Sequence, residues 1–259
     1  MNEEIDQRAL VRVPLITLPP MQRYHQRPAR RELHDGFAFL DLSGSGSSVN
    51  CLTVYSEPDP VQLVELARAF FGSEGFDVIV ESETTTAFEA RLIEHGWQLD
   101  EEEPAMLLTP IPEIPPTPAE LDIRRVTTEA ALADFMGITH TGQRWIPSLE
   151  AATDPNVAIF VGYVADRPVA ASRINCMGEI GDINGVETLP EYRRRGIGTA
   201  MTWAAVAAGR DRDCSAITLS ASAMGYPVYR RMGFEPVCVY RTYIQPDTRE
   251  QRDISGIDG

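Results

Sequence analysis

The chain has 259 residues, of which 43% are hydrophobic and 24% charged, and its formal net charge is −15. This length allows one large domain or two of ordinary size, with enough apolar residues to bury proper cores. The acidic balance argues against nucleic acid as a general partner, because that binding depends mostly on neutralising phosphates. An acidic surface instead attracts cations, protonated amines included, although a need for solubility alone also explains it.

Several signals of location and of bound metal are missing from the sequence. No stretch is apolar over the roughly 18 residues that a membrane span requires, and residues 1–6 lack the hydrophobic segment of a signal peptide. The four cysteines (Cys51, Cys176, Cys214 and Cys238) have no metal-binding spacing. We therefore expect a cytoplasmic protein with buried free thiols, no membrane segment and no metal. No motif fixes an oligomeric state.

The first half of the chain alternates between strand and helix patterns. The apolar residues 11–18 allow a strand, whereas the basic residues 22–31 receive no assignment. Further on, periodicity predicts strands over 36–42 and 50–56, a helix over 61–71, a strand over 76–80, a helix over 84–95, and a strand ending near residue 109. Gly96 follows the second helix where a left-handed cap residue is favoured.

A proline-rich segment divides the chain. Residues 110–118 carry five prolines in nine positions. Because proline lacks a backbone donor and fixes φ, this segment cannot be core helix or central strand. It predicts a stiff linker. We therefore divide the chain into a first domain over 1–109, a linker over 110–119, a second domain over 120–245 and a polar tail over 246–259.

The second half again alternates between strands and helices. Its pattern predicts a strand over 121–126, a helix capped by Thr127 and ending near residue 138, irregular chain over 139–149, a hairpin over 157–165 and 168–175, a strand over 181–188, an alanine-rich helix from residue 197, a strand over 217–220, a short helix over 227–232 and a final strand over 237–243. Gly233 is expected to end the short helix.

One loop in this half has the composition of an anion site. Pro190-Glu-Tyr-Arg-Arg-Arg-Gly-Ile-Gly-Thr199 joins a strand to the alanine-rich helix. Glycine allows a sharp turn, and a helix N-terminus adds unpaired N–H donors and a positive dipole end. Together they suit a phosphate or pyrophosphate. No Gly-Lys-Ser/Thr follows, and the next glycine is Gly209, so neither the P-loop nor the dinucleotide fingerprint fits.

The spacing Arg193-x-x-Gly196-x-Gly198 resembles the acyl-CoA pyrophosphate loop of the GNAT family of N-acetyltransferases. The segment Ser222-Ala-Met-Gly-Tyr-Pro-Val-Tyr-Arg-Arg-Met-Gly-Phe234 is similar to the family's late helix, and the order loop, helix, strand, helix, strand also agrees. The resemblance covers residues 121–243.

This resemblance implies an α/β (α+β) fold of the acyl-CoA N-acyltransferase type, in which helices flank a mixed, bent sheet. Acyl-CoA would lie where two neighbouring parallel strands splay apart, here the strands that end at Thr188 and Ser220.

The first half repeats the same order in outline, and the segment from Tyr55 to Gly96 is about as long as that from Thr188 to Gly233. Its turn at residues 56–60 has two carboxylates, no arginine and no glycine pair, and carboxylates repel a pyrophosphate. The resemblance therefore implies two tandem GNAT-like domains, of which the first is a degenerate copy that does not bind CoA. An unrelated α/β domain is the alternative.

By the same resemblance, the residues that would hold acetyl-CoA fall into two groups. Backbone N–H groups of the strand would pair with the pantetheine arm, and one of them could polarise the thioester carbonyl. The helix start would hold the pyrophosphate, and Ser222 stands where the family often has an asparagine that contacts the arm. The full set is Val186, Glu187, Thr188, Arg194, Arg195, Gly196, Ile197, Gly198, Thr199 and Ser222.

Tyr229 matches the family's general acid, which protonates the leaving thiolate; packing under the cofactor is its other possible role, and Tyr226 is a weaker candidate. A base is also needed, because a free alkyl amine is mostly protonated at neutral pH. Glu187 is the candidate base. If its side chain faces the cleft, burial raises its pKa, whereas if it faces outward it is a surface acid. His140 and Trp145 are candidate acceptor-site residues, with core packing or capping as the alternative.

The activity implied is transfer of an acetyl group from acetyl-CoA to a primary amine, on a small molecule or a peptide, by direct attack in a ternary complex. A protein N-terminus or lysine is a second possible acceptor. The rival from another class is a non-catalytic acyl-CoA-binding sensor or interaction module. Ligand pockets are common between domains, so the first half could contribute to the acceptor site.

Overall fold

The computed structural model describes residues 6–17, 19–20, 29–41, 50–72, 75–83, 85–139 and 148–245. The elements of the first half are α1 (Gln7–Ile16), β1 (Arg30–His34), β2 (Phe37–Asp41), β3 (Cys51–Val54), α2 (Pro60–Phe71), β4 (Asp77–Glu81), α3 (Thr86–Glu94) and β5 (Gln98–Leu108). Those of the second half are β6 (Asp122–Arg125), α4 (Glu129–Ile138), α5 (Leu149–Ala152), β7 (Val157–Val164), β8 (Arg167–Met177), β9 (Ile180–Thr188), the 3-10 turn η3 (Pro190–Tyr192), α6 (Ile197–Arg210), β10 (Ala216–Ser220), α7 (Tyr226–Met232) and β11 (Glu235–Ile244).

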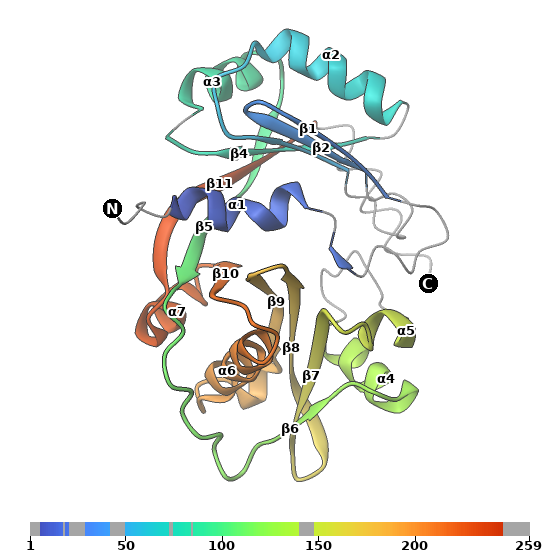
Figure 1. Cartoon of the computed structure of the whole chain (residues 1–259), viewed down its shortest axis with the longest axis vertical. Coiled ribbons are helices and arrows are strands. Elements are labelled where there is room, and N and C mark those ends of the chain that lie inside the picture. Colours follow the sequence, from blue (N-terminus) through green and yellow to red (C-terminus); the bar gives the residue numbers. More distant parts are fainter. Residues whose placement is uncertain are drawn as a thin grey trace.

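The strands of the described residues form one mixed, 11-stranded sheet in the order β1-β2-β3-β4-β11-β5-β10-β9-β8-β7-β6. Figure 1 shows α2 and α3 at one end of the molecule, α4, α5 and α6 toward the other, and α1 between them. This is the mixed sheet flanked by helices that the family resemblance implied.

Alternation of side chains along the strands assigns the helices to the two faces of the sheet. In β8, Ala170 packs in the cluster under α6, whereas its neighbour Ala171 packs in the cluster under α4 and α5. In β10, Ile217 packs with α6, whereas Ala216 packs in the cluster that includes Val11 of α1. Helix α6 therefore covers one face of the sheet, and α1, α4 and α5 cover the other.

The two halves repeat one topology, β3-α2-β4-α3-β5 and β9-α6-β10-α7-β11. The first two strands of each repeat pair in parallel. The last strands are exchanged: β5 pairs with β10 of the other repeat, and β11 pairs with β4, while β5 and β11 also pair with each other. The predicted domain boundary at residues 110–119 therefore lies between two repeats that complete each other's sheets.

Two local predictions were wrong. A strand was considered over residues 11–18, but residues 11–16 belong to helix α1. Leu10, Val11 and Leu15 pack on the sheet at helical spacing, although Pro14 lies inside the helix. The cap of α4 is Thr128 rather than Thr127, and its side chain accepts a hydrogen bond from the Ala131 N–H at 3.2 Å.

The predicted glycine caps and the buried free thiols are confirmed. Gly96 and Gly233 follow their helices with φ of +86° and +98°, which a residue with a side chain rarely adopts. All four cysteines are free and buried. In the part of the chain that the structure describes, no helix combines the length and the apolar character needed to cross a membrane.

Candidate functional site

The site is built around the point where two parallel strands separate. Strands β9 and β10 pair only from Ile180–Ala216 to Asp182–Thr218. Beyond Asp182, β9 continues for six residues beside β8 alone, with its other edge facing no strand in the described sheet. This is the splay that the family resemblance implied between the strands ending at Thr188 and Ser220.

A β-bulge turns the free part of β9. The register with β8 shifts between Glu187–Ala171 and Asn184–Arg173, and Gly185 within the shift has φ of +62°. Val186 packs in the clusters under α6. Glu187, which pairs with Ala171, lies half-buried on the opposite face of the sheet.

The loop after β9 leaves the start of α6 open. The N-cap of α6 is Gly196, with φ of +76° and no side-chain capping hydrogen bond. Its first turn therefore presents backbone donors of Ile197, Gly198 and Thr199 that no side chain of the cap satisfies. Ile197 is itself buried, so only its backbone can reach a ligand. A helix of 14 residues that begins in this way suits a phosphate group.

The three arginines of the loop have different surroundings. Arg193 Nε donates to the carbonyl of Thr188 at 3.0 Å, which ties the loop to the end of β9. Arg195 lies 3.5 Å from the carboxylate of Glu120, and its guanidinium carbon lies 5.4 Å from the centre of the Tyr192 ring. Arg194 is exposed, with φ of +65°. Of the two arginines predicted to bind cofactor, Arg194 is therefore the more available.

Tyr229 on α7 is half-buried, with its ring centre 5.9 Å from that of Phe234. Burial raises its pKa to about 12, a hydrogen bond with Thr202 of α6 opposes the shift, and the charge of Glu103 adds to it. The Thr202 hydroxyl in turn donates to the Gly198 carbonyl at 2.9 Å, so Tyr229 is linked to the first turn of α6. The phenol is therefore protonated at neutral pH, as a general acid must be.

The remaining predicted site residues stay predictions. The Ser222 hydroxyl accepts a hydrogen bond from the Gly225 N–H at 3.2 Å, so it caps the turn before α7. His140 and Trp145 lie outside the described residues. Within the described ranges, no group of three or more His, Cys, Asp or Glu residues is placed to hold a metal ion.

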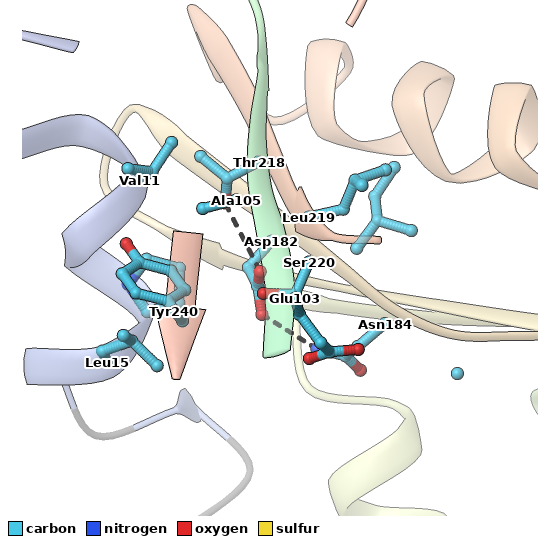
Figure 2. Close-up of a pocket in the computed structure, with 13 residues that line it drawn as sticks. Val11, Leu15, Glu103, Ala105, Asp182, Asn184, Thr218, Leu219, Ser220 and Tyr240 are labelled. Carbon is cyan, nitrogen blue, oxygen red and sulfur yellow. Dashed lines mark hydrogen bonds between the residues drawn. The ribbon is translucent and has the colours of Figure 1, made fainter. Parts of the chain in front are cut away.

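A cavity of about 340 Å³ lies at the splay, on the face of the sheet that α1 covers (Figure 2). Both halves of the chain line it. The first half contributes Val11, Pro14, Leu15, Glu103 and Ala105, and the second contributes Asp182, Ile183, Asn184, Gly185, Thr218, Leu219, Ser220 and Tyr240. Glu103 reaches this face because it shares a side of β5 with Ala105, which packs with α1.

Asp182 is held in the cavity wall by a chain of hydrogen bonds, drawn in part in Figure 2. Its two oxygens accept from Thr218 Oγ1 at 3.3 Å and from Asn184 Nδ2 at 2.9 Å. Arg173 in turn donates to the Asn184 carbonyl oxygen. Burial nevertheless dominates and raises the pKa of Asp182 to about 6, against the opposing effects of these hydrogen bonds and of the Arg173 charge.

Glu103, unlike Asp182, has no hydrogen-bond donor beside its carboxylate among the described residues. Its side chain makes no hydrogen bond or ion pair with any residue that the structure describes. Burial, with repulsion from Glu101 as the smaller cause, raises the pKa of Glu103 to about 7. A half-buried carboxylate that takes up and releases a proton near neutral pH therefore faces the splay.

Comparison with known proteins agrees with this geometry. Residues 125–234 match the model of the acetyltransferase (GNAT) family. Residues 125–234 are a GNAT domain. No curated protein matches the chain in sequence at a significant level.

Solved structures extend the likeness to the rest of the chain. A GCN5-related N-acetyltransferase from Kribbella flavida aligns with a TM-score of 0.73 and 19% identity, over 92% of this chain and 95% of that one. A GCN5-related N-acetyltransferase from Sphaerobacter thermophilus aligns with a TM-score of 0.58 and 16% identity, over 82% and 81%. A tandem GNAT protein from the clavulanic acid biosynthesis pathway aligns with a TM-score of 0.52 and 11% identity, over 80% and 77%. The first half therefore shares the fold as well.

The repeat in the first half lacks the features that make the GNAT domain a candidate for binding. The N-terminus of α2, which corresponds to α6, is capped by Asp59, whose carboxylate accepts from the Val61 N–H at 2.9 Å. Glu57 likewise accepts from the Ala87 N–H at 3.1 Å at the start of α3. Strands β3 and β4 pair along the whole of β3. The Asp59 carboxylate thus occupies the place that an anion would need at the start of α2, and β3 and β4 do not separate along β3.

The cavity residues Glu103 and Asp182 were not predicted. Glu103 stands in a run of three glutamates, and periodicity alone does not say which of them faces a ligand. The missing information is the exchange of β5 into the sheet of the GNAT domain, because it brings residue 103 beside the end of β10. From the sequence, Asp182 is an ordinary strand residue. Its position at the cavity follows only from the separation of β9 from β10, which pair as far as Asp182 and Thr218.

Proposed function

We propose that the protein is an N-acetyltransferase that transfers the acetyl group of acetyl-CoA to a primary amine by direct attack in a ternary complex. The observation that carries this proposal is the juxtaposition of three features. They are the uncapped start of α6, the splay of β9 from β10 just before it in the chain, and the protonated Tyr229, which is linked to the first turn of α6 through Thr202. They suit a pyrophosphate, a thioester arm and a leaving thiolate respectively.

In this proposal, the pyrophosphate is bound by the backbone of residues 194–199 with Arg194, and the pantetheine arm lies along the free edge of β9. The amine nitrogen forms a bond to the thioester carbon, and the C–S bond breaks. The thiolate takes its proton from Tyr229, and the amine gives its proton to a carboxylate on the opposite face of the sheet, for which Glu187 was the predicted base. An N–H of residues 186–188 would stabilise the oxyanion.

Charge supports an amine as the acceptor. The formal net charge of −15 favours the approach of a cation, and the described lining of the cavity has two carboxylates and no basic side chain. The N-terminus of α6 supports a phosphate-bearing acyl donor. Its glycine cap leaves backbone N–H groups without a side-chain acceptor, whereas Asp59 accepts from the corresponding N–H groups of α2.

The proposal is tested by calorimetric titration of the whole chain with acetyl-CoA, followed by assay of thiol release with primary amines. Gly196→Ala should weaken acetyl-CoA binding by about tenfold or more, because a left-handed alanine costs about 1–2 kcal/mol and the loop will relax away from it. Gly178→Ala is the matched control, since Gly178 also has positive φ (+63°) and open space, but lies in the turn at the far end of β9.

Three outcomes separate the alternatives. Binding with thiol release, lost in Gly196→Ala and retained in Gly178→Ala, supports the enzyme. Binding without release from any amine or peptide supports an acyl-CoA-binding sensor instead. No binding at all overturns the proposal.

A further inference from the structure

We propose that Glu103, supplied by the first half of the chain, is the carboxylate that binds the acceptor amine and receives its proton, in a cavity that selects small amines. This inference rests on the proposed function. It places the acceptor site between the two repeats. The exchange of β5 into the sheet of the second repeat would then supply a catalytic residue.

The location of the cavity is the first step. It is lined by Asp182 and Thr218, the last parallel pair of β9 and β10, and by residues just beyond them on each strand. Helix α6 and the open loop lie on the other face of the sheet. A thioester that enters the splay from the α6 side would therefore present its carbonyl carbon to a nucleophile held in this cavity.

The two carboxylates of the cavity are suited to different tasks. The buried charge of Asp182 is partly offset, because Thr218 and Asn184 donate to its oxygens and the Arg173 charge stabilises its ionised form. Glu103 has no donor among the described residues and is half-buried. An ammonium group is the partner that such a carboxylate lacks, since burying an unpaired charge is costly.

The charged and titratable groups around Glu103 come from several elements. Glu101 lies on its own strand, Asp182 on β9, Tyr240 on β11 and Tyr229 on α7. The cations of the neighbouring elements are already engaged, because Arg173 of β8 donates to Asn184 and Arg8 and Arg12 of α1 form ion pairs with Glu81. Glu103 acts on Tyr229 electrostatically, because its charge raises the pKa of the phenol. A base and an acid that interact across the splay are placed to receive the amine proton and to protonate the thiolate.

Glu187 is less well placed for this task. It has an interaction partner of its own, and it does not belong to the described lining of the cavity. It also lies five residues beyond Asp182, where β9 has already turned at the bulge. Glu103 therefore replaces Glu187 as the base in this inference.

Helix α1 limits the size of the acceptor. Val11, Pro14 and Leu15 form an apolar wall of the cavity. The helix is fixed by Glu81, whose side chain is 1% exposed and whose oxygens lie 3.0 Å from Arg8 and 2.8 Å from Arg12. A cavity of about 340 Å³ behind this wall fits a small amine with a short hydrocarbon body rather than a folded protein chain.

The test uses the full chain with acetyl-CoA and a panel of ethylamine, butylamine, putrescine, 2-phenylethylamine and a peptide with one free lysine. Glu103→Gln should lower kcat/KM for the best small amine by about 10²-fold at pH 7, a typical effect of losing a general base. Glu101→Gln is the matched control, because it removes the same charge from an exposed position on the same strand. Glu103→Asp should recover part of the rate, and Leu15→Trp should raise KM for the larger amines.

The pH profile separates a base from a residue that only shapes the cavity. In the wild type, kcat/KM should rise with a midpoint near pH 7. In Glu101→Gln the same rise should appear at a somewhat lower pH, because repulsion from Glu101 is the smaller cause of the raised pKa of Glu103. The rise should be absent from Glu103→Gln. All variants should bind acetyl-CoA with the wild-type affinity.

If the wild type fails to bind acetyl-CoA, the proposed function itself has failed. If it binds and turns over, but Glu103→Gln behaves like Glu101→Gln or Glu187→Gln alone loses the rise, the assignment of Glu103 is overturned. Turnover of the peptide alone, or of no amine, overturns the small-amine site.

Discussion

At the scale of single residues, the Glu103 carboxylate in the cavity destabilises the folded protein. Burial raises the pKa of Glu103 from an ordinary 4.5 to about 7. An acid whose pKa is higher in the folded state binds more protons folded than unfolded, so stability falls as pH rises from about 4.5 to about 7. Such a side chain is retained at a loss of stability, which is typical of functional sites.

Glu103→Gln should therefore stabilise the protein at pH 8, by about 1–2 kcal/mol after allowance for partial exposure. At pH 5 the difference should shrink to about a quarter of this value, because the native carboxyl is then protonated while the unfolded one, with its ordinary pKa of 4.5, is still mostly ionised. Thermal or urea unfolding of both proteins at the two pH values measures this. Equal stabilisation at both values would mean that the glutamate is not destabilised by its charge.

Tyr229→Phe should lower kcat by about 10²–10³-fold, because the leaving thiolate loses its proton donor. Its ring contact with Phe234 survives the change, so acetyl-CoA binding should remain close to that of the wild type. Tyr226→Phe on the same helix is the control and should change kcat less than threefold or so. A kcat that is insensitive to Tyr229→Phe would remove the general-acid role.

At the scale of elements, two helices of the same topology differ at their N-termini. Helix α6 begins at a glycine that offers no capping oxygen, whereas α2 begins at Asp59, which accepts from its first backbone donors. The difference was visible in the sequence as two glycines and three arginines against two carboxylates. It is an electrostatic difference, because a carboxylate at a helix start occupies the place of an anionic ligand.

Calorimetric titration should accordingly find one acetyl-CoA site per chain. Asp59→Ser should leave this number unchanged, because β3 and β4 do not part and the turn supplies no arginine. A second site in the wild type would contradict the view that the first repeat has lost cofactor binding.

Sequence patterns predicted these elements because they depend on neighbouring residues. The anion loop, the glycine caps and the position of Tyr229 are each contained within about ten residues of chain. Three other features depend on contacts between distant residues. The position of Glu103 requires the pairing of β5 with β10, the face of Glu187 requires the bulge at Gly185, and the helical state of α1 requires its packing on the sheet despite Pro14.

At the scale of the whole molecule, the exchange of β5 and β11 makes each repeat depend on the other. Without β5, strand β10 would have an open edge and the cavity would lose Glu103. Without β11, strand β4 would have an open edge. Open edges of this kind favour aggregation. The proline-rich segment over 110–118 therefore connects two parts that share one sheet.

A protease site inserted between Pro116 and Thr117, both exposed, tests this dependence. After cleavage, the two fragments should elute together in size-exclusion chromatography and keep one acetyl-CoA site, because the pairing of β5 with β10 and of β11 with β4 crosses the cut without needing the linker. Expressed alone, residues 120–259 should aggregate or fail to bind acetyl-CoA. Separation of the cleaved fragments under native conditions, or an active second half on its own, would show instead that the exchanged strands are dispensable.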